Sequence, residues 1–474
     1  MDYLYQSLAN RWAKNIDQGV YLPGDRLPGV RSASRNEGVS PATVIAAYER
    51  LEIDGYIEAR PRSGFYVKAR RATNQAEPGL SKPSPKPQAV TGQELVLQLI
   101  RNANRPDVVQ LGANVPNETY LPTTAISREL KRIARLHIDQ LGDYEMPPGL
   151  PKLRQQIARR MALMGCETNP EDVLITNGCQ EAIYLSLKCV TKPGDVVAVE
   201  SPTYYGLLQV LDSLGLKALE IPSHSSTGLS VDALQLAFEQ WPVKACVFVP
   251  NYANPLGSIM PDTQKRALLN LLGQYPEITV IEDDIYGDLH FGEQRPSPLK
   301  SMDNKNQVIY CSSFSKSLSA GLRIGWVLAP QHQEQLALEK FVHNCSTSVV
   351  NQLTLAGMLE NGSYERHLRS MRLALSQNVN RLAEKVIQHF PQGVRLSRPE
   401  GGMSVWLELP KGIDTTALFN AATAADISIA PGQIFSSDPK KYRRCMRLNA
   451  GVPWNERLDQ AVHQLGQLAH ELIQ

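Results

Sequence analysis

The chain has 474 residues, of which 42% are hydrophobic and 20% are charged, an ordinary composition for a globular protein. Its length exceeds the roughly 250–300 residues at which one hydrophobic core stops growing, so we expect two or more domains and exclude fibrous or largely disordered classes. The 49 lysine and arginine residues against 47 aspartate and glutamate residues leave a formal charge of +2, so any contact with nucleic acid must be local.

The cysteines and the amino-terminal residues indicate in which cell compartment the protein is expected. The seven cysteines fall at irregular intervals, with no C-x-x-C pair and an odd total, which predicts the reducing cytoplasm. The nine histidines form neither H-x-x-x-H nor H-E-x-x-H, so we expect no metal site. Residues 1–6 lack the regions of a signal peptide, and no stretch approaches about 18 uninterrupted apolar residues, so neither export nor a membrane span is indicated.

The head of the chain, residues 1–70, has the pattern of three helices followed by two short strands. The expected helices are residues 4–16, Val30–Glu37 and Ala42–Ile53, and the expected strands are Tyr56–Arg60 and Gly64–Lys68. Ser40 is the candidate N-cap of the third helix, and Pro41 occupies its first position. This order predicts a winged helix-turn-helix.

A proline-rich stretch follows the head. Residues 71–95 contain Pro78, Pro83, Pro85 and Pro87 and almost no large apolar residues, so they cannot form a core and are expected to be an extended, semi-rigid linker. If fully extended, roughly 25 such residues span about 60–75 Å.

The body, residues 96–474, alternates apolar runs of strand length with helical stretches. The expected strands are Val173–Thr176, Val196–Glu200, Ala245–Pro250, Thr279–Glu282, Val308–Ser312 and Ile324–Leu328. Strands separated by helices predict an α/β domain with a mainly parallel sheet and helices on both faces. The chain after Gly362 predicts a small α+β subdomain with a long helix over Tyr364–Gln388 and strands near Val405–Leu409 and Arg447–Asn449.

The helix pair of the head predicts a contact with DNA, because a tight turn between two helices lets the second lie in a major groove. Residues 1–71 carry eleven lysines and arginines and eight acids, a net charge of +3. Arg26 and Arg31 near the first helix of the pair, and Arg60 and Arg62 on the wing, are candidate phosphate ligands.

The run GDRLPGVRSASRNEGVSPATVIAAYERLEIDGYIEARPRSGFYV closely resembles the DNA-binding domain of GntR-family transcriptional regulators. The resemblance covers most of residues 1–67 and implies phosphate or groove contacts for Arg31 and Thr43 and a wing tip at Arg62-Ser63-Gly64. Pro41 departs from the arginine that the family often has at this position. Sequence preference is therefore expected from Ser40, Thr43 or the wing.

Lys316 is the first candidate for chemistry in the body, because the segment Ser313-Phe314-Ser315-Lys316 directly follows an expected strand. A lysine at the carboxyl end of a strand can form a Schiff base while neighbouring serine hydroxyls hold a phosphate. The pattern S-x-x-K also occurs in penicillin-recognising enzymes, so a serine acyl enzyme using Ser313 and Lys316 is a competing hypothesis, although neither K-T-G nor S-D-N accompanies it.

Other residues supply what a pyridine aldehyde phosphate needs around its ring. Asp283 can lie against the ring nitrogen and keep it protonated, which makes the ring an electron sink. Asn254 and Tyr286 can hydrogen-bond the phenolic oxygen, and Tyr204 offers a flat face on which the ring can stack.

The phosphate has its own candidates. Gly178, Cys179 and Gln180 lead from a strand into a helix, so their backbone N–H groups point at an anion from a helix N-terminus. Arg323, seven residues after Lys316, adds a guanidinium. Each of these residues lies beside the end of an expected strand, and ligands of α/β sheets bind at the carboxyl ends of strands.

The body resembles fold-type I pyridoxal phosphate enzymes of the aspartate aminotransferase superfamily over about residues 96–474. The similar stretches are YEMPPGLPKLR, TNGCQEA, ESPTYYG, PNYANPLG, IEDDIYGDL, SSFSKSLSAGLRIGW and MRLNAG. The resemblance implies that Lys316 is the internal aldimine lysine, that Asp283 is the ring-nitrogen partner, and that Tyr144 is a phosphate ligand lent by the other subunit of a homodimer. It also implies that Arg447 clamps an α-carboxylate, a task suited to its planar fork. Asn114 stands where relatives usually have the glycine of Gly-x-Pro. This difference implies a narrower or differently polar pocket for the effector, the small molecule that the protein would sense.

A GntR head fused to such a body is the architecture of the MocR subfamily of bacterial regulators. The resemblance implies a winged helix-turn-helix joined to a fold-type I transferase-like domain, and a DNA-binding regulator that uses pyridoxal 5'-phosphate to sense a small amino compound as an external aldimine. The alternative is an active aminotransferase with secondary DNA binding, since both hypotheses use the same residues.

Overall fold

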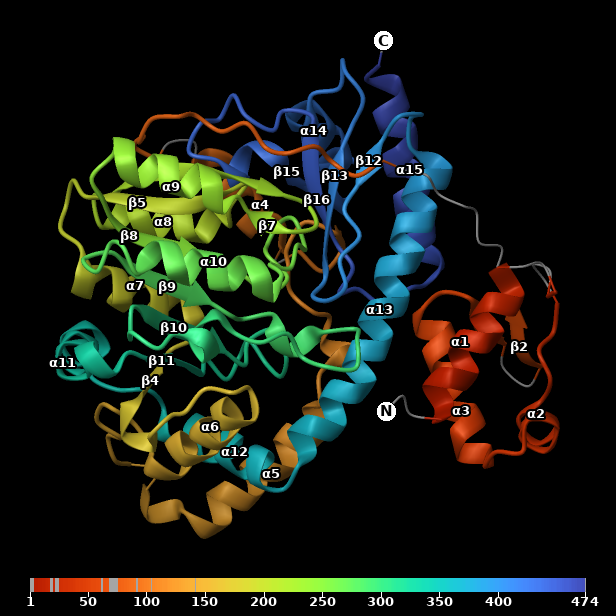
Figure 1. Ribbon diagram of the computed structural model, residues 1–474, viewed down its shortest axis with the longest axis horizontal. Coiled ribbons are helices and arrows are strands. Elements are labelled where there is room, and N and C mark those ends of the chain that lie inside the picture. Colours follow the sequence, from red (N-terminus) through yellow and green to blue (C-terminus); the bar gives the residue numbers. More distant parts are fainter. Residues whose placement is uncertain are drawn as a thin grey trace. The chain divides into compact units, whose positions relative to one another are not determined.

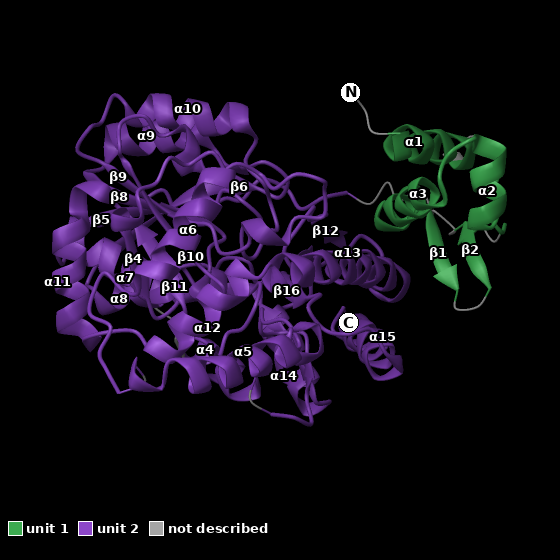
Figure 2. Ribbon diagram, turned by 90° about the horizontal axis from the view of Figure 1, so that it is seen from below, with its two compact units in different colours: residues 1–75 green, residues 76–474 purple. Residues whose placement is uncertain are grey.

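The computed structural model describes residues 4–17, 20–21, 25–60, 63–67, 76–90, 93–103, 105–140 and 142–473. The chain divides into two compact units, residues 1–75 and residues 76–474 (Figure 2). Each unit has its own hydrophobic core. Within the described ranges, no helix is long and apolar enough to cross a membrane.

Unit 1 is the winged helix-turn-helix that the sequence predicts. Its elements are α1 (Leu4–Asp17), α2 (Val30–Glu37), α3 (Pro41–Ile53), β1 (Ile57–Arg60) and β2 (Gly64–Val67) (Figure 1). The two strands pair antiparallel as the wing. Trp12 of α1 stacks on Tyr48 of α3 with their ring centroids 4.8 Å apart, so aromatic packing joins the recognition helix to the rest of the head.

The turn between α2 and α3 depends on local backbone chemistry. Gly38 ends α2 with a φ of 66°, a left-handed conformation that glycine adopts without a steric penalty. Ser40 caps α3, because its hydroxyl accepts a hydrogen bond from the backbone N–H of Thr43 at 3.1 Å. Pro41 at the first helical position lacks an N–H that would otherwise have no partner. The turn is therefore encoded within a few consecutive residues.

Unit 2 is built on an eight-stranded sheet with the order β4-β11-β10-β9-β8-β5-β6-β7. The strands are β4 (Val173–Thr176), β5 (Val196–Ser201), β6 (Lys217–His224), β7 (Gly228–Leu229), β8 (Val243–Phe248), β9 (Thr279–Asp283), β10 (Val308–Ser313) and β11 (Gly325–Leu328). The pairs from β10 through β9, β8 and β5 to β6 are parallel, whereas β11 and β7 pair antiparallel. The mainly parallel sheet is confirmed.

Helices cover both faces of this sheet. They are α5 (Thr123–Leu136), α6 (Pro151–Leu163), α7 (Cys179–Val190), α8 (Tyr205–Ser213), α9 (Val231–Gln240), α10 (Asp262–Leu272), α11 (Gln333–Asn344) and α12 (Val349–Glu360). The helix α4 (Gln93–Ala103) instead packs against the C-terminal part of the chain, including Trp406 and Phe435. Neighbouring residues of the strands alternate between two cores: Leu174 and Val327 lie in one, and Ile175 and Trp326 lie in the other. Both faces are therefore buried, which explains the unbroken apolar runs in the sequence.

A smaller α+β subdomain completes unit 2. It contains α13 (Ser363–His389), α14 (Thr415–Ala424), α15 (Glu456–Glu471) and a sheet of order β12-β13-β16-β15. The strands are β12 (Arg395–Leu396), β13 (Ser404–Glu408), β15 (Ala430–Pro431) and β16 (Cys445–Asn449), and β14 (Ile427–Ser428) pairs with β3 (Val109–Gln110). The expected long helix and the two expected strands are all present. A core of its own, including Leu407, Met446 and Leu465, holds the subdomain together.

Short 3-10 helices connect several of these elements. They are η1 (Glu118–Tyr120), η2 (Ile138–Gln140), η3 (Pro170–Asp172), η4 (Gly287–Leu289), η5 (Leu299–Met302), η6 (Pro330–His332) and η7 (Gly432–Phe435).

The proline-rich stretch is docked on unit 2. Gln88 and Ala218 of β6 exchange both backbone hydrogen bonds, each at 2.9 Å, and the indole N–H of Trp241 donates to the carbonyl of Pro85 at 3.1 Å. We call residues 76–90 the docked segment (orange in Figure 1). The chain between β2 and this segment is then residues 68–75, which span at most about 30 Å. The reach of about 60–75 Å expected for a wholly free linker does not apply, because these bonds hold more than half of it.

We predict that Ser40→Ala lowers the free energy of unfolding of unit 1 by about 1 kcal/mol, because the first turn of α3 loses its side-chain cap. Chemical denaturation of the full chain measures this change. Unfolding is monitored through the fluorescence of Trp12 in a variant that lacks the other tryptophans. Ser32→Ala, on the exposed surface of α2, is the matched control. Equal stability of the two variants would contradict the capping role.

Candidate functional site

A cavity of about 210 Å³ opens at the carboxyl ends of the parallel strands. Strand β9 ends at Asp283 and β10 at Ser313, and the loops that follow them bring Tyr286 and Lys316 to the cavity. The expected site residues that line it are Asn114, Cys179, Gln180, Tyr204, Asn254, Asp283, Tyr286, Ser315, Lys316 and Arg323. Residues far apart in the sequence therefore meet at one edge of the sheet, as parallel strands require.

Lys316 and Asp283 are the two ionisable groups at the centre of the cavity. The Lys316 amine donates to the backbone carbonyl of Asn114 at 2.7 Å. Desolvation, aided by the nearby guanidinium of Arg447, lowers the pKa of Lys316 to about 8. Burial raises the pKa of Asp283 to about 6. At neutral pH, the lysine is thus partly available as a neutral amine while the aspartate stays largely ionised.

The carboxylate of Asp283 is oriented by two donors. The thiol of Cys179 donates to its Oδ1 at 3.1 Å, and the backbone N–H of Ile285 donates to the same atom at 3.2 Å. Burial next to Asp283 raises the pKa of the Cys179 thiol well above its ordinary value, so the sulfur keeps its proton. The sequence predicts a role only for the backbone of Cys179, and its side chain contributes a second contact.

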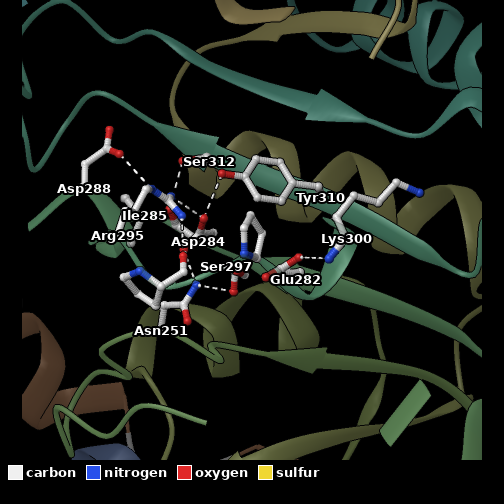
Figure 3. A network of polar contacts seen from close by, with 12 residues as sticks. Asn251, Glu282, Asp284, Ile285, Asp288, Arg295, Ser297, Lys300, Tyr310 and Ser312 are labelled. Atoms are coloured by element: carbon white, nitrogen blue, oxygen red, sulfur yellow. Dashed lines mark hydrogen bonds and ion pairs between the residues drawn. The ribbon is translucent and has the colours of Figure 1, made fainter. Parts of the chain in front are cut away.

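A polar network holds the side chains of the residues on both sides of Asp283, Glu282 and Asp284 (Figure 3). The side chain of the next residue, Asp284, accepts hydrogen bonds from Tyr310 at 2.9 Å and Asn251 at 3.1 Å and forms an ion pair with Arg295. On the other side, Glu282 accepts from the backbone N–H groups that begin η5, including that of Leu299 at 2.6 Å. Of the three consecutive acids, only Asp283 lines the cavity.

Tyr286 and Asn254 meet at the opposite side of the cavity. The phenol oxygen of Tyr286 accepts from the side-chain amide of Asn114 at 2.8 Å and from that of Asn254 at 3.4 Å. Burial raises the pKa of the Tyr286 phenol above its ordinary range, so it remains a hydrogen-bond donor. Asn254 in turn accepts from the guanidinium of Arg447 at 2.9 Å, which links the two ends of the site.

Arg447 is completely buried in β16. Besides Asn254, its guanidinium donates to the backbone carbonyl of Gly112 and lies 5.2 Å from the ring centroid of Phe435. Desolvation lowers the pKa of Arg447. Its Nε has no hydrogen-bond partner among the described residues. A buried guanidinium held only by neutral groups is suited to binding an anion.

The residues expected at a phosphate lie at the start of α7. Gly178 has a φ of 87°, and a Cβ there would lie 2.6 Å from the guanidinium of Arg323, so only glycine leaves room for this approach. The hydroxyl of Ser313 accepts from the backbone N–H of Ser315 at 3.0 Å and thereby turns the loop. The hydroxyl of Ser315 has no partner within the described chain. Helix N-terminus, guanidinium and hydroxyl form a cradle for an anion.

Aromatic residues form one wall. Tyr204 lines the cavity, and a Cβ at Gly206 would overlap its ring, so the glycine lets the ring pack closely over the start of α8. The ring of Tyr205 is 4.8 Å from that of Tyr204 and also lines the cavity. Tyr205, Gly206 and Phe435 were not predicted as site residues. The first two are adjacent to Tyr204 in ESPTYYG, whereas nothing in the sequence distinguishes Phe435.

Tyr144 lies apart from this cavity within its own chain. Its side chain is 72% exposed, and it does not line the cavity. The position is compatible with the expectation that it serves the site of a second subunit.

The expected DNA contacts lie in unit 1. Arg26 and Arg31 are exposed, and the guanidinium of Arg26 packs against Gly64 of the wing, whose φ of 110° requires a glycine. The hydroxyl of Ser40 is used in the cap and contacts the hydroxyl of Thr43 at 2.8 Å. Arg62 lies outside the described residues.

The exposed face of α3 includes a residue that was not predicted from the sequence. Ile45 is 44% exposed, although large aliphatic residues on an ordinary helix face its core. The sequence could have indicated this residue, because Ile45 is a large apolar residue outside the apolar face that Val44 and Ala47 form on the helix. On a recognition helix, an exposed aliphatic side chain can contact a thymine methyl group.

Comparison with known proteins finds a matching family for each of the two units. A family described as "Aminotransferase class I and II" matches residues 106–465, and "Bacterial regulatory proteins, gntR family" matches residues 4–67. Two proteins of Escherichia coli (strain K12), described as uncharacterized HTH-type transcriptional regulators, are similar over 99% of both chains: YjiR with 38% identity over 470 residues and YdcR with 39% over 469.

Unit 2 also resembles solved aminotransferases. LysN, an alpha-aminoadipate aminotransferase from Thermus thermophilus complexed with N-(5'-phosphopyridoxyl)-L-leucine, has a TM-score of 0.75 at 27% identity, covering 81% of this chain and 96% of that one. A multiple substrate aminotransferase from Thermococcus profundus has a TM-score of 0.74 at 28% identity, with the same coverage. Since the full-length relatives join these two domains as regulators, the chain belongs to the MocR subfamily of GntR-family transcriptional regulators, in which a DNA-binding head is fused to an aminotransferase-like body.

Proposed function

We propose that this regulator binds pyridoxal 5'-phosphate and senses a small amino compound that carries a carboxylate, and that this binding changes its affinity for DNA. The observation that carries the proposal is the pair of buried atoms without partners at Ser315 and Arg447 among the described residues, since Lys316 and Asp283 lie in the same site. Buried polar atoms normally have partners, and a cofactor phosphate and an effector carboxylate would supply them.

The residues present fit the cofactor. Its phosphate would take the N–H groups at the start of α7, the guanidinium of Arg323 and the hydroxyl of Ser315. Its ring would lie between the face of Tyr204 and the opposite wall, with Asp283 at the ring nitrogen. When bound, the cofactor supplies an aldehyde that reacts with amines and a ring that accepts electrons.

The chain's own residues then have defined tasks. The Lys316 amine, with its pKa of about 8, is neutral in a usable fraction at neutral pH and would be the nucleophile toward the aldehyde. Asp283, with its pKa of about 6, is ionised above that pH and would keep a proton on the ring nitrogen. Tyr286 and Asn254 orient the phenolic oxygen through the contacts that they already share.

The effector would be recognised by its carboxylate. Arg447 would exchange its bonds to Asn254 and the carbonyl of Gly112 for two parallel bonds to the carboxylate. Asn114 adds a selective contact, because its Oδ1 is buried and has no partner among the described residues. This side chain stands where relatives have glycine, so it both narrows the pocket and favours an effector with a donor group.

A second candidate is an active aminotransferase. The observation in its favour is that the neutral amine of Lys316 and the ionised Asp283 are both retained beside the carboxylate-binding Arg447, which is the complete set for amino-group transfer. Steady turnover of an amino acid and a keto acid at a rate similar to that of catalytic relatives, with DNA binding unaffected by either, would favour the enzyme over the regulator.

On the DNA side, Arg26 and Arg31 are proposed to bind phosphates, and Thr43 and Ile45 to face the major groove. The wing, which includes Gly64, is proposed as a further DNA contact, and the proposed contact of Arg62 falls on a residue outside the described ranges. A homodimer in the cytoplasm would present two such heads to two half-sites, as symmetric regulators do.

We predict that Lys316→Ala abolishes covalent attachment of the cofactor, because this lysine is the amine that faces the cavity. Borohydride reduction followed by mass spectrometry measures the adduct. Lys192→Ala, at an exposed position, is the control and should keep it. A stable adduct in the Lys316→Ala protein would contradict the assignment.

Cofactor uptake should depend on pH. The rate at which apoprotein takes up pyridoxal phosphate should rise as the neutral fraction of Lys316 grows with pH, and should level off above about pH 8, where the amine is mostly neutral. Absorbance changes on mixing, between about pH 6.5 and 9.5, measure this rate. A tenfold rise per pH unit that continues to the upper limit would show an unperturbed lysine.

A homodimer in which Tyr144 serves the partner's site makes a complementation test possible. Tyr144→Phe and Lys316→Ala each damage both sites of their own dimers, but a mixed dimer regains one intact site. Subunit exchange followed by cofactor titration should therefore recover tight binding in up to one site per mixed dimer. Mixing Tyr144→Phe with the double variant is the control, and recovery in neither mixture would contradict the arrangement.

Replacing Arg447 should separate sensing from DNA binding. We expect Arg447→Lys to keep its basal DNA affinity but to lose most of its response to α-amino acids, because an ammonium cannot form the bidentate contact. DNA titrations at fixed salt, with amino acids and with the corresponding amines that lack a carboxylate, measure the response. A full response in the variant would exclude carboxylate capture as the signal.

A further inference from the structure

The docked segment touches both parts of unit 2. On the side of the large sheet, the backbone N–H of Ser223 in β6 donates to the hydroxyl of Ser81 at 2.8 Å. On the side of the small subdomain, the amine of Lys441 donates to the carbonyl of Lys82 at 3.0 Å, and the side chains of Ser81 and Tyr442 hydrogen-bond. Two adjacent residues of the segment therefore bridge the two parts of the body.

The small-subdomain contacts come from one loop, residues 436–444, which we call the clamp loop. The chain immediately before it ends at Phe435, whose ring lies under the guanidinium of Arg447, and the chain after it enters β16, which carries Arg447 itself. The clamp loop thus begins next to a residue that contacts Arg447 and ends three residues before Arg447 itself. Between these ends, Lys441 and Tyr442 contact the docked segment. A shift of Arg447 and Phe435 must move this loop.

Hydrogen bonds to β6 position the start of the clamp loop. Buried Glu220 of β6 accepts from the hydroxyl and backbone N–H of Ser437 at 2.7 and 2.6 Å and from the hydroxyl of Ser436 at 2.8 Å. Beside these contacts, the docked segment, the clamp loop and β13 line a cavity of about 570 Å³. Because interiors are otherwise close-packed, this space leaves the loop room to change position.

We propose that the docked segment transmits effector binding from Arg447 to the DNA-binding head; this inference rests on the function proposed above. When a carboxylate takes over the guanidinium, Arg447 releases Asn254 and the carbonyl of Gly112. The clamp loop then shifts, and its bonds to Ser81 and Lys82 change. Only residues 68–75 separate the docked segment from β2, so a displacement of this segment alters the positions that the head can take. The effector can change the affinity for DNA only by the factor by which it prefers one arrangement of the protein over the other, typically about 5–150-fold.

The test uses full-length protein loaded with pyridoxal phosphate and a duplex that this protein selects from a random pool. Aminooxyacetate is the probe, because it condenses with the cofactor aldehyde and carries a carboxylate; methoxyamine condenses in the same way without one. In the wild type, we expect aminooxyacetate to change the Kd for DNA at least about fivefold and methoxyamine to change it less than about twofold.

The critical variant is Lys441→Met/Tyr442→Phe, which removes the clamp-loop bonds to the docked segment and also the bond of Tyr442 to the hydroxyl of Ser201 in β5. It should keep the cofactor content and the basal Kd of the wild type and respond less than about twofold to aminooxyacetate. Trp241→Phe is the matched control: it removes one hydrogen bond to the docked segment from the large-sheet side only and should respond like the wild type. Lys441→Met alone changes a surface side chain and guards against misfolding; it should reduce the response.

Hydrogen exchange of residues 76–90 provides an independent readout. Aminooxyacetate should change the exchange rates of this segment at least about twofold in the wild type and leave them unchanged in the double variant. A double variant that responds like the wild type would overturn the route through the docked segment and leave the proposed function intact. A wild type whose DNA affinity ignores aminooxyacetate would instead overturn the proposed function.

Discussion

The parallel run of β8, β9 and β10 is the constraint on which the site depends. Parallel strands direct their carboxyl ends to one edge, so Asn254, Asp283 and Lys316, each in the loop or at the end of a different strand, converge there. The sheet alone would leave these side chains free to turn. An ion pair between Asp284 and Arg295 holds the chain at the end of β9. A hydrogen bond from the backbone N–H of Ser315 to the hydroxyl of Ser313 holds it at the end of β10.

Burial of the converging side chains shifts the pKa values of the two ionisable groups at the centre of the site. The same desolvation acts in opposite directions on the two central groups: it raises the pKa of Asp283 and lowers that of Lys316, so their values approach each other near neutrality. The two groups are not paired directly in the structure, because the lysine donates to Asn114 and the aspartate accepts from Cys179. Each is therefore held in place by a neutral group and remains available to a ligand.

Most of the fold and much of the site follow from sequence patterns. Apolar runs such as Val308–Ser312 predict buried parallel strands because both faces are covered, and the residues after them could be assigned by position. Strand β6 was missed, because Pro222 and its polar neighbours interrupt the pattern. Asp283 could be assigned to the site because it ends an expected strand, but the contacts of its neighbours Glu282 and Asp284 could not be predicted, since only the tertiary structure shows what lies on the other face of a strand. Docking of residues 76–90 was equally hidden, because its hydrogen bonds use backbone groups and side chains from distant parts of the sequence, such as Trp241 and Lys441.

The short connection between the units has a consequence for operators. In a homodimer, each head is tied to its body by residues 68–75, and this connection spans at most about 30 Å. Moving one half-site by a full helical turn of DNA displaces it by about 34–36 Å, which exceeds the extended length of one such connection. Such a regulator would therefore bind half-sites only within a bounded range of spacings, and base changes between the half-sites would matter less than large insertions.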